Sequence, residues 1–160
     1  MRKTLVVYDS YFGNTEKIAL AIGDALKSQT DVQVLRVGDV KPEHLAGLEL
    51  LVVGSPTRAF SASPATKGWL KALAPDSLRG VKAAAFDTRV ALSEVKSRVL
   101  PVFVKLFGYA AEPIAKNLVK RGGMLVIPAE GFFVKDTEGP LKDGELERAA
   151  AWAQQIRARA

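Results

Sequence analysis

The sequence predicts an α/β fold in which helices cover both faces of a doubly wound, parallel sheet of five strands. Three observations support this prediction. Short apolar runs without alternation recur along the chain, as is typical of buried parallel strands. Segments with apolar residues at helical spacing separate these runs, so strands and helices alternate throughout. Turns rich in glycine and hydroxyl side chains follow the first and third runs, where parallel strands would end.

The strands are predicted from the positions of the apolar runs. We expect them at residues 3–8, 32–37, 50–53, 81–86 and 124–133. Pro128 interrupts the last run. Because proline has no N–H to donate to a neighbouring strand, we expect this fifth strand to lie at an edge of the sheet.

The helices are predicted from apolar residues that recur every three or four positions. We expect helices at residues 14–28, 66–73, 109–121 and 145–157. In the first helix, Ile18, Ile22 and Leu26 lie on one face. In the last helix, the residues predicted to face inward are Leu146, Ala149, Ala153 and Ile156.

Length and composition limit the class of protein. With 160 residues and 48% hydrophobic side chains, the chain is expected to form one domain spanning residues 1–160. It contains no cysteine, which excludes disulfides, thiol catalysis and ligation of iron–sulfur clusters. The apolar run after Met1 is too short for a signal peptide, so we expect a soluble, cytoplasmic protein.

The positive charge is concentrated in the middle of the chain. The net charge is +6, and residues 58–121 contain twelve Lys and Arg against four Asp and Glu. Such a segment suits an acidic partner protein, an anionic substrate or an anionic lipid surface. No groove-reading motif accompanies it, which argues against nucleic acid. Residues 95–112 mix apolar residues with Lys and Arg, so they either pack on the sheet or contact a partner or membrane surface.

The turn after the first strand is the most informative segment. It reads Ser10-Tyr11-Phe12-Gly13-Asn14-Thr15 and leads directly into the first predicted helix. Free N–H groups at a helix start bind anions, the hydroxyls add donors, and Gly13 allows the backbone to approach a ligand. These features predict a site for a phosphate monoester. The alternative is a ligand-free turn in which Asn14 caps the helix.

The segment Ser10-Tyr11-Phe12-Gly13-Asn14-Thr15 resembles the phosphate loop of the flavodoxin family, which binds the phosphate of FMN. Three further segments resemble the same family in order and spacing. They are residues 54–60, which resemble the loop covering one face of the flavin ring, residues 86–89, and residues 130–148. The resemblance implies the flavodoxin strand order 2-1-3-4-5, which places the fifth strand at an edge.

The resemblance also implies a set of FMN-binding residues. The phosphate would be held by Ser10, Tyr11, Phe12, Gly13, Asn14 and Thr15. The flavin would be contacted by Ser55, Pro56, Thr57, Arg58, Ala59 and Phe60. Asp87, Thr88 and Arg89 would reach the ring or the ribityl chain. Two alternatives stay open: Phe60 packs beneath a loop, or Asp87 and Arg89 form a solvated surface pair.

Two features depart from the family pattern. Typical flavodoxins are acidic, whereas Arg58 and Arg89 flank the inferred ring site here, which favours the reduced, anionic flavin and predicts a less negative reduction potential. In flavodoxins a peptide of this loop commonly changes orientation, and a glycine allows that change at little cost. The segment Thr57-Arg58-Ala59-Phe60 contains no glycine.

The function expected from these residues is electron transfer by an FMN-binding, flavodoxin-like carrier. No general acid or base and no metal site are evident in the sequence. The alternative is an FMN-dependent oxidoreductase, such as a quinone reductase or a flavodoxin-type protoporphyrinogen oxidase, whose anionic substrate would suit the positive charge. A signalling receiver domain is disfavoured, because Gly54-Ser55 stand where its phosphorylated Asp would follow the third strand.

Overall fold

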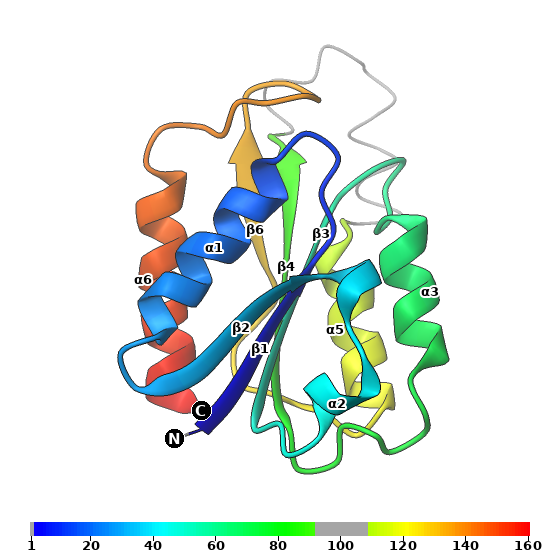
Figure 1. Cartoon of the computed structure of the whole chain (residues 1–160). Coiled ribbons are helices and arrows are strands. Elements are labelled where there is room, and N and C mark those ends of the chain that lie inside the picture. Colours follow the sequence, from blue (N-terminus) through cyan, green and yellow to red (C-terminus); the bar gives the residue numbers. More distant parts are fainter. Residues whose placement is uncertain (1, 92–108) are drawn as a thin grey trace.

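The computed structural model describes residues 2–91 and 109–160, and in them strands and helices alternate as expected (Figure 1). In chain order the elements are β1 Arg2–Tyr8, α1 Asn14–Leu26, β2 Thr30–Arg36, the 3₁₀ turn η1 Val37–Asp39, α2 Pro42–Leu45, β3 Leu50–Pro56, α3 Pro64–Ala72, β4 Lys82–Val90, α5 Ala111–Lys120, β5 Met124–Leu125, β6 Glu130–Val134 and α6 Glu145–Arg159. The stretch at residues 95–112, predicted to pack on the sheet or to contact a partner or membrane, lies outside the described residues except for 109–112.

The strands form one parallel sheet in the order β2-β1-β3-β4-β5, with β6 also paired to β4. This confirms the predicted fold class and strand order. The predicted fifth strand is divided into two short pieces, β5 and β6, which pair with successive parts of β4. Pro128 lies between them, so the strand is at the sheet edge as predicted, but its continuity over residues 124–133 was predicted wrongly.

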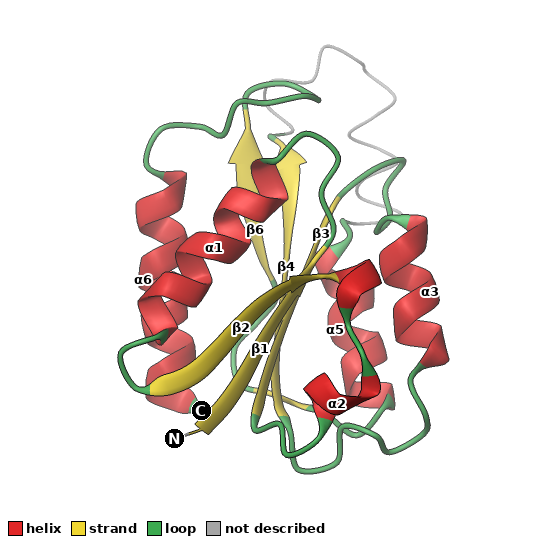
Figure 2. Cartoon of the chain, viewed as in Figure 1, coloured by secondary structure: helices red, strands yellow, loops and turns green. Residues whose placement is uncertain are grey.

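Helices cover the sheet on both faces, which gives three layers (Figure 2). Helices α1 and α6 pack together on one face, and α3 and α5 pack together on the other. Alternating residues of the central strands contribute to the two cores. On β3, Val52 faces the core beneath α1 and α6, whereas Val53 faces the core beneath α3 and α5. The tight packing of both cores fixes the ends of the strands that carry the loops.

Two local predictions are corrected by the structure. The side chain of Leu146 was expected to face inward but is 43% exposed, because α6 instead buries Glu145, whose carboxylate accepts hydrogen bonds from the Phe133 N–H and from Arg148. The fourth strand was expected to end at residue 86, but β4 continues to Val90, and its residues 87–90 pair with residues 131–134 of β6. The polar side chains at residues 87–89 do not show the apolar pattern of a buried strand, so the sequence did not predict this part of β4.

Candidate functional site

A cleft opens at the carboxyl ends of the strands, where the loops after β1 and β3 meet the end of β4 and the segment that follows β6. The strand order reverses between β1 and β3, and ligands of doubly wound folds bind at such a point. The residues that line the cleft are Ser10, Tyr11, Phe12, Asn14, Thr15, Pro56, Thr57, Arg58, Thr88, Arg89, Val90, Val134 and Thr137. Ten of the fifteen residues predicted from the sequence are therefore brought together on one cleft.

The phosphate loop, residues 10–15, leaves the start of α1 without a side-chain cap. Gly13 is the N-cap residue, with φ of 90°, a conformation that glycine adopts at little cost. Its N–H donates to Ser10 Oγ at 3.0 Å, and its carbonyl accepts the first helical hydrogen bond from Lys17. Because the cap supplies no acceptor to the first helical N–H groups, those groups are available to an anion.

Asn14 does not cap the helix, so the capping role in that alternative was wrong. It is the first helical residue, and its Nδ2 donates to the carbonyl of Glu138 at 3.1 Å. The Asn14 side chain thereby joins the phosphate loop to the segment before α6. A Cβ atom on Gly139 would lie 2.6 Å from Asn14 Nδ2, which explains a glycine at this close approach.

Two threonines join the phosphate loop to β4. Thr15 Oγ1 and Thr88 Oγ1 lie 2.8 Å apart in a hydrogen bond, and both residues are almost fully buried. Both also line the cleft. Each hydroxyl has one donor and two acceptor positions, so this pair can bond to each other and still donate one hydrogen bond to a ligand. The sequence resemblance predicted both residues but not their contact.

Arg36, at the end of β2, holds the outer side of the phosphate loop. Its Nη1 donates to the Ser10 carbonyl at 2.9 Å and to Asp9 Oδ1 at 3.2 Å, and its Nη2 reaches Glu16 Oε2 at 3.4 Å. Tyr8 donates to the same Glu16 oxygen at 2.8 Å. Partial burial and the Glu16 carboxylate raise the pKa of the Tyr8 hydroxyl. The sequence analysis missed Arg36, although the strand order 2-1 places it beside Tyr8.

The turn at residues 58–61 forms the opposite side of the cleft. The N–H of Arg58 donates to the Ser61 carbonyl at 2.9 Å, and the N–H of Ser61 donates to the Arg58 carbonyl at 3.0 Å. The two residues between them, Ala59 and Phe60, have φ of 47° and 66°. The turn thus adopts the left-handed conformation of a two-residue hairpin without any glycine.

The Arg58 guanidinium bridges the two sides of the cleft. Its central carbon lies 4.8 Å from the ring centre of Tyr11 and 5.8 Å from that of Phe12. Both rings are 46% exposed, so a cation and two aromatic rings form the outer rim of the cleft. Contacts of this kind stabilise an exposed pair by about 0.5–1 kcal/mol.

Asp87 and Arg89 are not a surface pair, so that alternative was wrong. Asp87 is 0% exposed and accepts hydrogen bonds from Arg89 at 2.6 and 2.7 Å and from the Ala111 N–H at 2.9 Å. Burial raises the pKa of the Asp87 carboxyl, and the hydrogen bonds from Arg89 oppose that shift. The Arg89 guanidinium carbon also lies 3.7 Å from the ring centre of Tyr109. Asp87 therefore positions Arg89 at the cleft.

Other predicted residues adjoin the cleft without lining it. Ser55 is fully buried, and its Oγ donates to the Pro56 carbonyl at 3.0 Å and accepts from the Ser63 N–H at 2.9 Å. Phe60 and Ala59 form the 58–61 turn. Val134 and Thr137 line the cleft but were not predicted individually, although they lie within the segment 130–148 that carried part of the resemblance.

Among the residues that the structure describes, the cleft is lined by cations and by no carboxylate. Arg58 and Arg89 are the charged residues among those that line it. Among the residues that the structure describes, no group of three or more Asp, Glu or His side chains is placed to hold a metal ion. No helix in the described part of the chain has the length and apolar character needed to cross a membrane.

Comparison with solved structures shows the same architecture in flavodoxins. A flavodoxin from the domain Archaea is 25% identical, with a TM-score of 0.75, over 97% of this chain and 96% of that chain. Flavodoxin 2 from Bacillus cereus is 22% identical, with a TM-score of 0.78, over 99% of each chain. The rubredoxin oxygen:oxidoreductase of Desulfovibrio gigas is 20% identical, with a TM-score of 0.71, over 97% of this chain but 35% of that chain.

Comparison with sequence families gives a consistent result. No curated protein sequence matches the chain at a significant level. The family model for flavodoxin, in contrast, matches residues 6–152, which include the phosphate loop, the 58–61 turn and most of α6. The chain therefore belongs to the flavodoxin family, whose cofactor is FMN.

Proposed function

We propose that this chain holds FMN by its phosphate in the phosphate loop and acts as an electron carrier. The observation that carries the proposal is the open start of α1, where Gly13 is the cap residue and supplies no side chain to the first helical N–H groups. A dianionic phosphate is the ligand that this arrangement suits best, because the N–H groups and the helix dipole both favour negative charge.

The residues present fit the phosphate end of the cofactor. Ser10, Thr15 and Thr88 are buried hydroxyl residues that line the cleft beside the helix start, and hydroxyls can donate to phosphate oxygens. The enclosed part of the cleft measures about 80 Å³, which suits this end rather than the whole cofactor. When bound, FMN supplies the redox chemistry, while the protein binds and orients it.

The remainder of the cleft would contact the flavin. Pro56, Thr57 and Arg58 line it from β3 and the turn that follows, and Arg89 lines it from β4. The Arg58 guanidinium places positive charge at this part of the cleft, whereas the charge of Arg89 is offset by its ion pair with buried Asp87. Positive charge favours a reduced, anionic flavin, so we expect a less negative reduction potential than that of acidic flavodoxins.

The lining favours a carrier over an enzyme. No Asp, Glu, His or Lys is among the described residues that line the cleft, so of the side chains that commonly transfer protons only Tyr11 stands there, on the exposed rim. A carrier needs only a bound flavin that a second protein can approach. The exposed rim of Tyr11, Phe12 and Arg58 would give such access.

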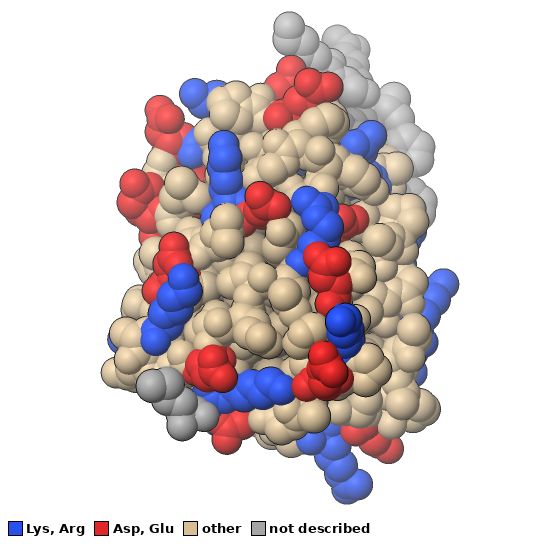
Figure 3. Space-filling view, in the orientation of Figure 1, with Lys and Arg blue, Asp and Glu red and all other residues tan. Residues whose placement is uncertain are grey.

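An acidic redox protein is the partner that the charge distribution suits. On the face shown in Figure 3, cationic and acidic side chains are interspersed, so that face has no dominant sign. Helices α3 and α5, which pack together, instead carry four exposed lysines. They are Lys67, Lys71, Lys116 and Lys120. Added salt should therefore slow electron exchange with an acidic partner and speed exchange with a basic one.

The decisive test mixes apoprotein with FMN or with riboflavin and follows the quenching of flavin fluorescence. We expect saturable quenching by FMN and little by riboflavin, which lacks the phosphate. Thr15→Val should weaken FMN binding about tenfold or more, because a hydrogen bond to a charged group is lost. Thr4→Val, at the other end of β1, is the matched control and should leave FMN binding unchanged.

A second measurement separates carrier from enzyme. The FMN-loaded protein is mixed with NADPH and a quinone, with and without a separate reductase. A carrier is reduced only when the reductase is present. Steady turnover by the protein alone would refute the carrier assignment, and equal binding of FMN and riboflavin would refute the assignment of the phosphate loop.

A further inference from the structure

A groove lies between α3 and α5, the two helices that pack together on one face of the sheet (Figure 1). We call it the helix groove. It measures about 100 Å³, which leaves room for a single apolar side chain. Its lining comes from the two helices and from the segment between β3 and α3, and it includes Ser61, Lys67, Leu70, Lys71, Ile114 and Asn117.

The surface of the helix groove is mostly apolar. Leu70 and Ile114 both line it, and each is 1% exposed within the core beneath α3 and α5. Arg121 joins the ends of the two helices, because its Nε donates to the Leu70 carbonyl at 3.4 Å and its Nη2 to the Lys71 carbonyl at 3.3 Å. The helices are thus linked to each other, and a docking group meets a preformed groove.

Positive charge borders the helix groove. Helices α3 and α5 together contain four lysines and one acidic residue, Glu112. Lys67 and Lys71 line the groove one helical turn apart, and no carboxylate is among the described residues that line it. Lys67 Nζ donates to Ser61 Oγ at 3.2 Å, whereas the Lys71 side chain has no hydrogen bond or ion pair to any described residue. An apolar groove with lysines at its edge suits an acidic segment that carries one apolar side chain.

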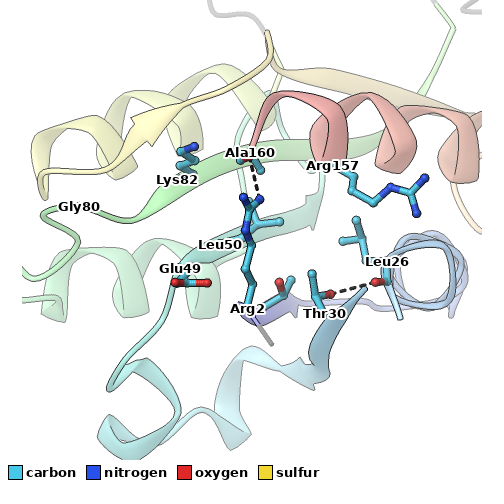
Figure 4. Close-up of a pocket in the computed structure, with 10 residues that line it drawn as sticks. Arg2, Leu26, Thr30, Glu49, Leu50, Gly80, Lys82, Arg157 and Ala160 are labelled. Carbon is cyan, nitrogen blue, oxygen red and sulfur yellow. Dashed lines mark hydrogen bonds between the residues drawn. The ribbon is translucent and has the colours of Figure 1, made fainter. Parts of the chain in front are cut away.

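The cavity at the amino ends of the strands differs in both respects (Figure 4). Its arginines already bond to the protein itself. Arg2 donates to the Ala160 carbonyl at 2.7 Å, and Arg157 donates to a serine hydroxyl in the turn after α1 at 3.2 Å. Its lining also contains the carboxylate of Glu49. We therefore expect no acidic segment at this cavity, and its arginines provide a control for the helix groove.

The helix groove and the cleft share the 58–61 turn. Ser61 lines the groove, and Arg58, at the other end of the turn, lines the cleft. Their backbones exchange hydrogen bonds at 2.9 and 3.0 Å. A partner seated in the groove would therefore lie beside the exposed rim of the cleft, where Arg58 contacts the rings of Tyr11 and Phe12. That position brings the partner close to a flavin in the cleft.

We propose that the helix groove docks an acidic segment of a partner protein, which places one apolar side chain between α3 and α5 and carboxylates beside Lys67 and Lys71. That the partner is a redox protein rests on the proposed function, whereas binding by the groove does not require FMN. The contact is small and charged at its edge, so it suits a transient encounter that added salt weakens.

The test uses the full chain, with and without FMN, and a short synthetic peptide in which glutamates flank one leucine. Binding is followed by backbone amide shifts in ¹H–¹⁵N spectra. We expect saturable shifts at Ser61, Leu70 and Ile114 in both forms of the protein. A peptide with serine in place of the leucine, and one with glutamine in place of the glutamates, should each bind about tenfold more weakly.

Two variants separate the charge of the groove from its shape. Lys71→Met should weaken binding of the glutamate–leucine peptide about threefold, because an exposed ion pair is lost. Asn117→Phe places a ring in the groove without changing the charge, and it should weaken binding about tenfold or more. The matched controls are Arg2→Met, at the amino ends of the strands, and Val119→Phe, at a half-exposed position of α5 outside the groove. Both controls should bind the peptide as the parent does.

Four results would overturn the proposal. They are the absence of saturable shifts, equal binding of the leucine and serine peptides, equal weakening by Lys71→Met and Arg2→Met, and equal weakening by Asn117→Phe and Val119→Phe. Self-association of the chain that Asn117→Phe abolishes would also overturn it, because the groove would then belong to a second copy. Peptide binding without any binding of FMN would refute the proposed function and leave the docking site intact.

Discussion

The phosphate loop and the 58–61 turn lie on opposite sides of one cleft and reach left-handed backbone conformations by different means. The phosphate loop places a glycine, Gly13, at its one left-handed position. The 58–61 turn places Ala59 and Phe60 there, although a side chain in this region is unfavourable by about 1 kcal/mol or more. The strained turn persists because the two hydrogen bonds between Arg58 and Ser61 close it.

This difference shows which side of the cleft is relaxed and which is held under strain. The backbone of the phosphate loop adopts its left-handed position without strain, and neighbours such as Arg36 hold the loop in place. The 58–61 turn depends on its surroundings, including the contact of Arg58 with the rings of Tyr11 and Phe12. Residues with unfavourable backbone angles of this kind are often found at ligand sites. Four predictions test the comparison.

The largest effect is expected at Gly54, a residue of β3 that comes after the phosphate loop and before the 58–61 turn in the sequence. A Cβ atom there would lie 2.0 Å from the tip of the Phe86 ring. That ring cannot move aside, because it packs edge-on against Phe132 and Trp152. Gly54→Ala should therefore lower the free energy of unfolding in urea by about 3 kcal/mol or more.

The control for Gly54→Ala is Gly68→Ala, within α3, where no atom lies within 4 Å of the added carbon. Gly68→Ala should raise the free energy of unfolding by about 1 kcal/mol, because alanine favours the helix. A free energy of unfolding for Gly54→Ala within 1 kcal/mol of the parent would show that the core at β3 and β4 is looser than this packing indicates.

The second prediction concerns the relaxed side of the cleft. Gly13→Ala adds a carbon that meets no atom within 4 Å, so its whole effect comes from the φ of 90°. It should lower the free energy of unfolding by about 1–2 kcal/mol, and it should weaken FMN binding about tenfold as the loop distorts. Flavin fluorescence titration and urea unfolding measure the two effects.

Gly47→Ala is the matched control for Gly13→Ala. Gly47 has φ of 69°, also without atoms near the added carbon, but it lies in the turn after α2 and away from the cleft. Gly47→Ala should lower the free energy of unfolding by a similar amount and leave the affinity for FMN unchanged. Equal loss of affinity in both variants would mean that the phosphate loop is not the FMN site.

The third prediction concerns the outside support of the phosphate loop. Arg36→Met keeps an apolar stem but removes the hydrogen bonds to Ser10, Asp9 and Glu16. Since these bonds are partly exposed, we expect a loss of about 1 kcal/mol in stability and a several-fold loss in FMN affinity. Lys27→Met, which removes an exposed pair with Asp24 at the end of α1, should change neither quantity. An unchanged FMN affinity in Arg36→Met would show that the loop holds its shape alone.

The comparison also explains which features could be predicted from the sequence. The phosphate loop was predictable because its chemistry is local: Gly13 and Thr15 lie within one short segment that has a recognisable order. Arg36 was missed because its role depends on the pairing of β2 with β1, which brings it beside a loop more than twenty residues earlier. Asp87 was misread because charged residues are usually exposed, whereas a partner on the same strand allows this one to be buried.

Ala59 and Phe60 mark the limit of such prediction. Their intrinsic preferences oppose the conformation they adopt, so no local rule places them in a left-handed turn. The fold class and the strand order were predictable because they depend on apolar runs in which many residues favour the same type of secondary structure.

The smallest effect is expected from relieving the strain at the turn. Ala59→Gly should raise the free energy of unfolding by about 0.5–1 kcal/mol, because glycine tolerates φ of 47° whereas alanine does not. The same substitution at Ala151, exposed within α6, should lower it by about 1 kcal/mol, since glycine disfavours a helix. Urea unfolding of the two variants compares one chemical change in two backbone conformations. Opposite signs would confirm that the 58–61 turn is strained. A loss at both positions would instead mean that the freedom gained by the unfolded chain outweighs the strain, and the two sides of the cleft would then be equally relaxed.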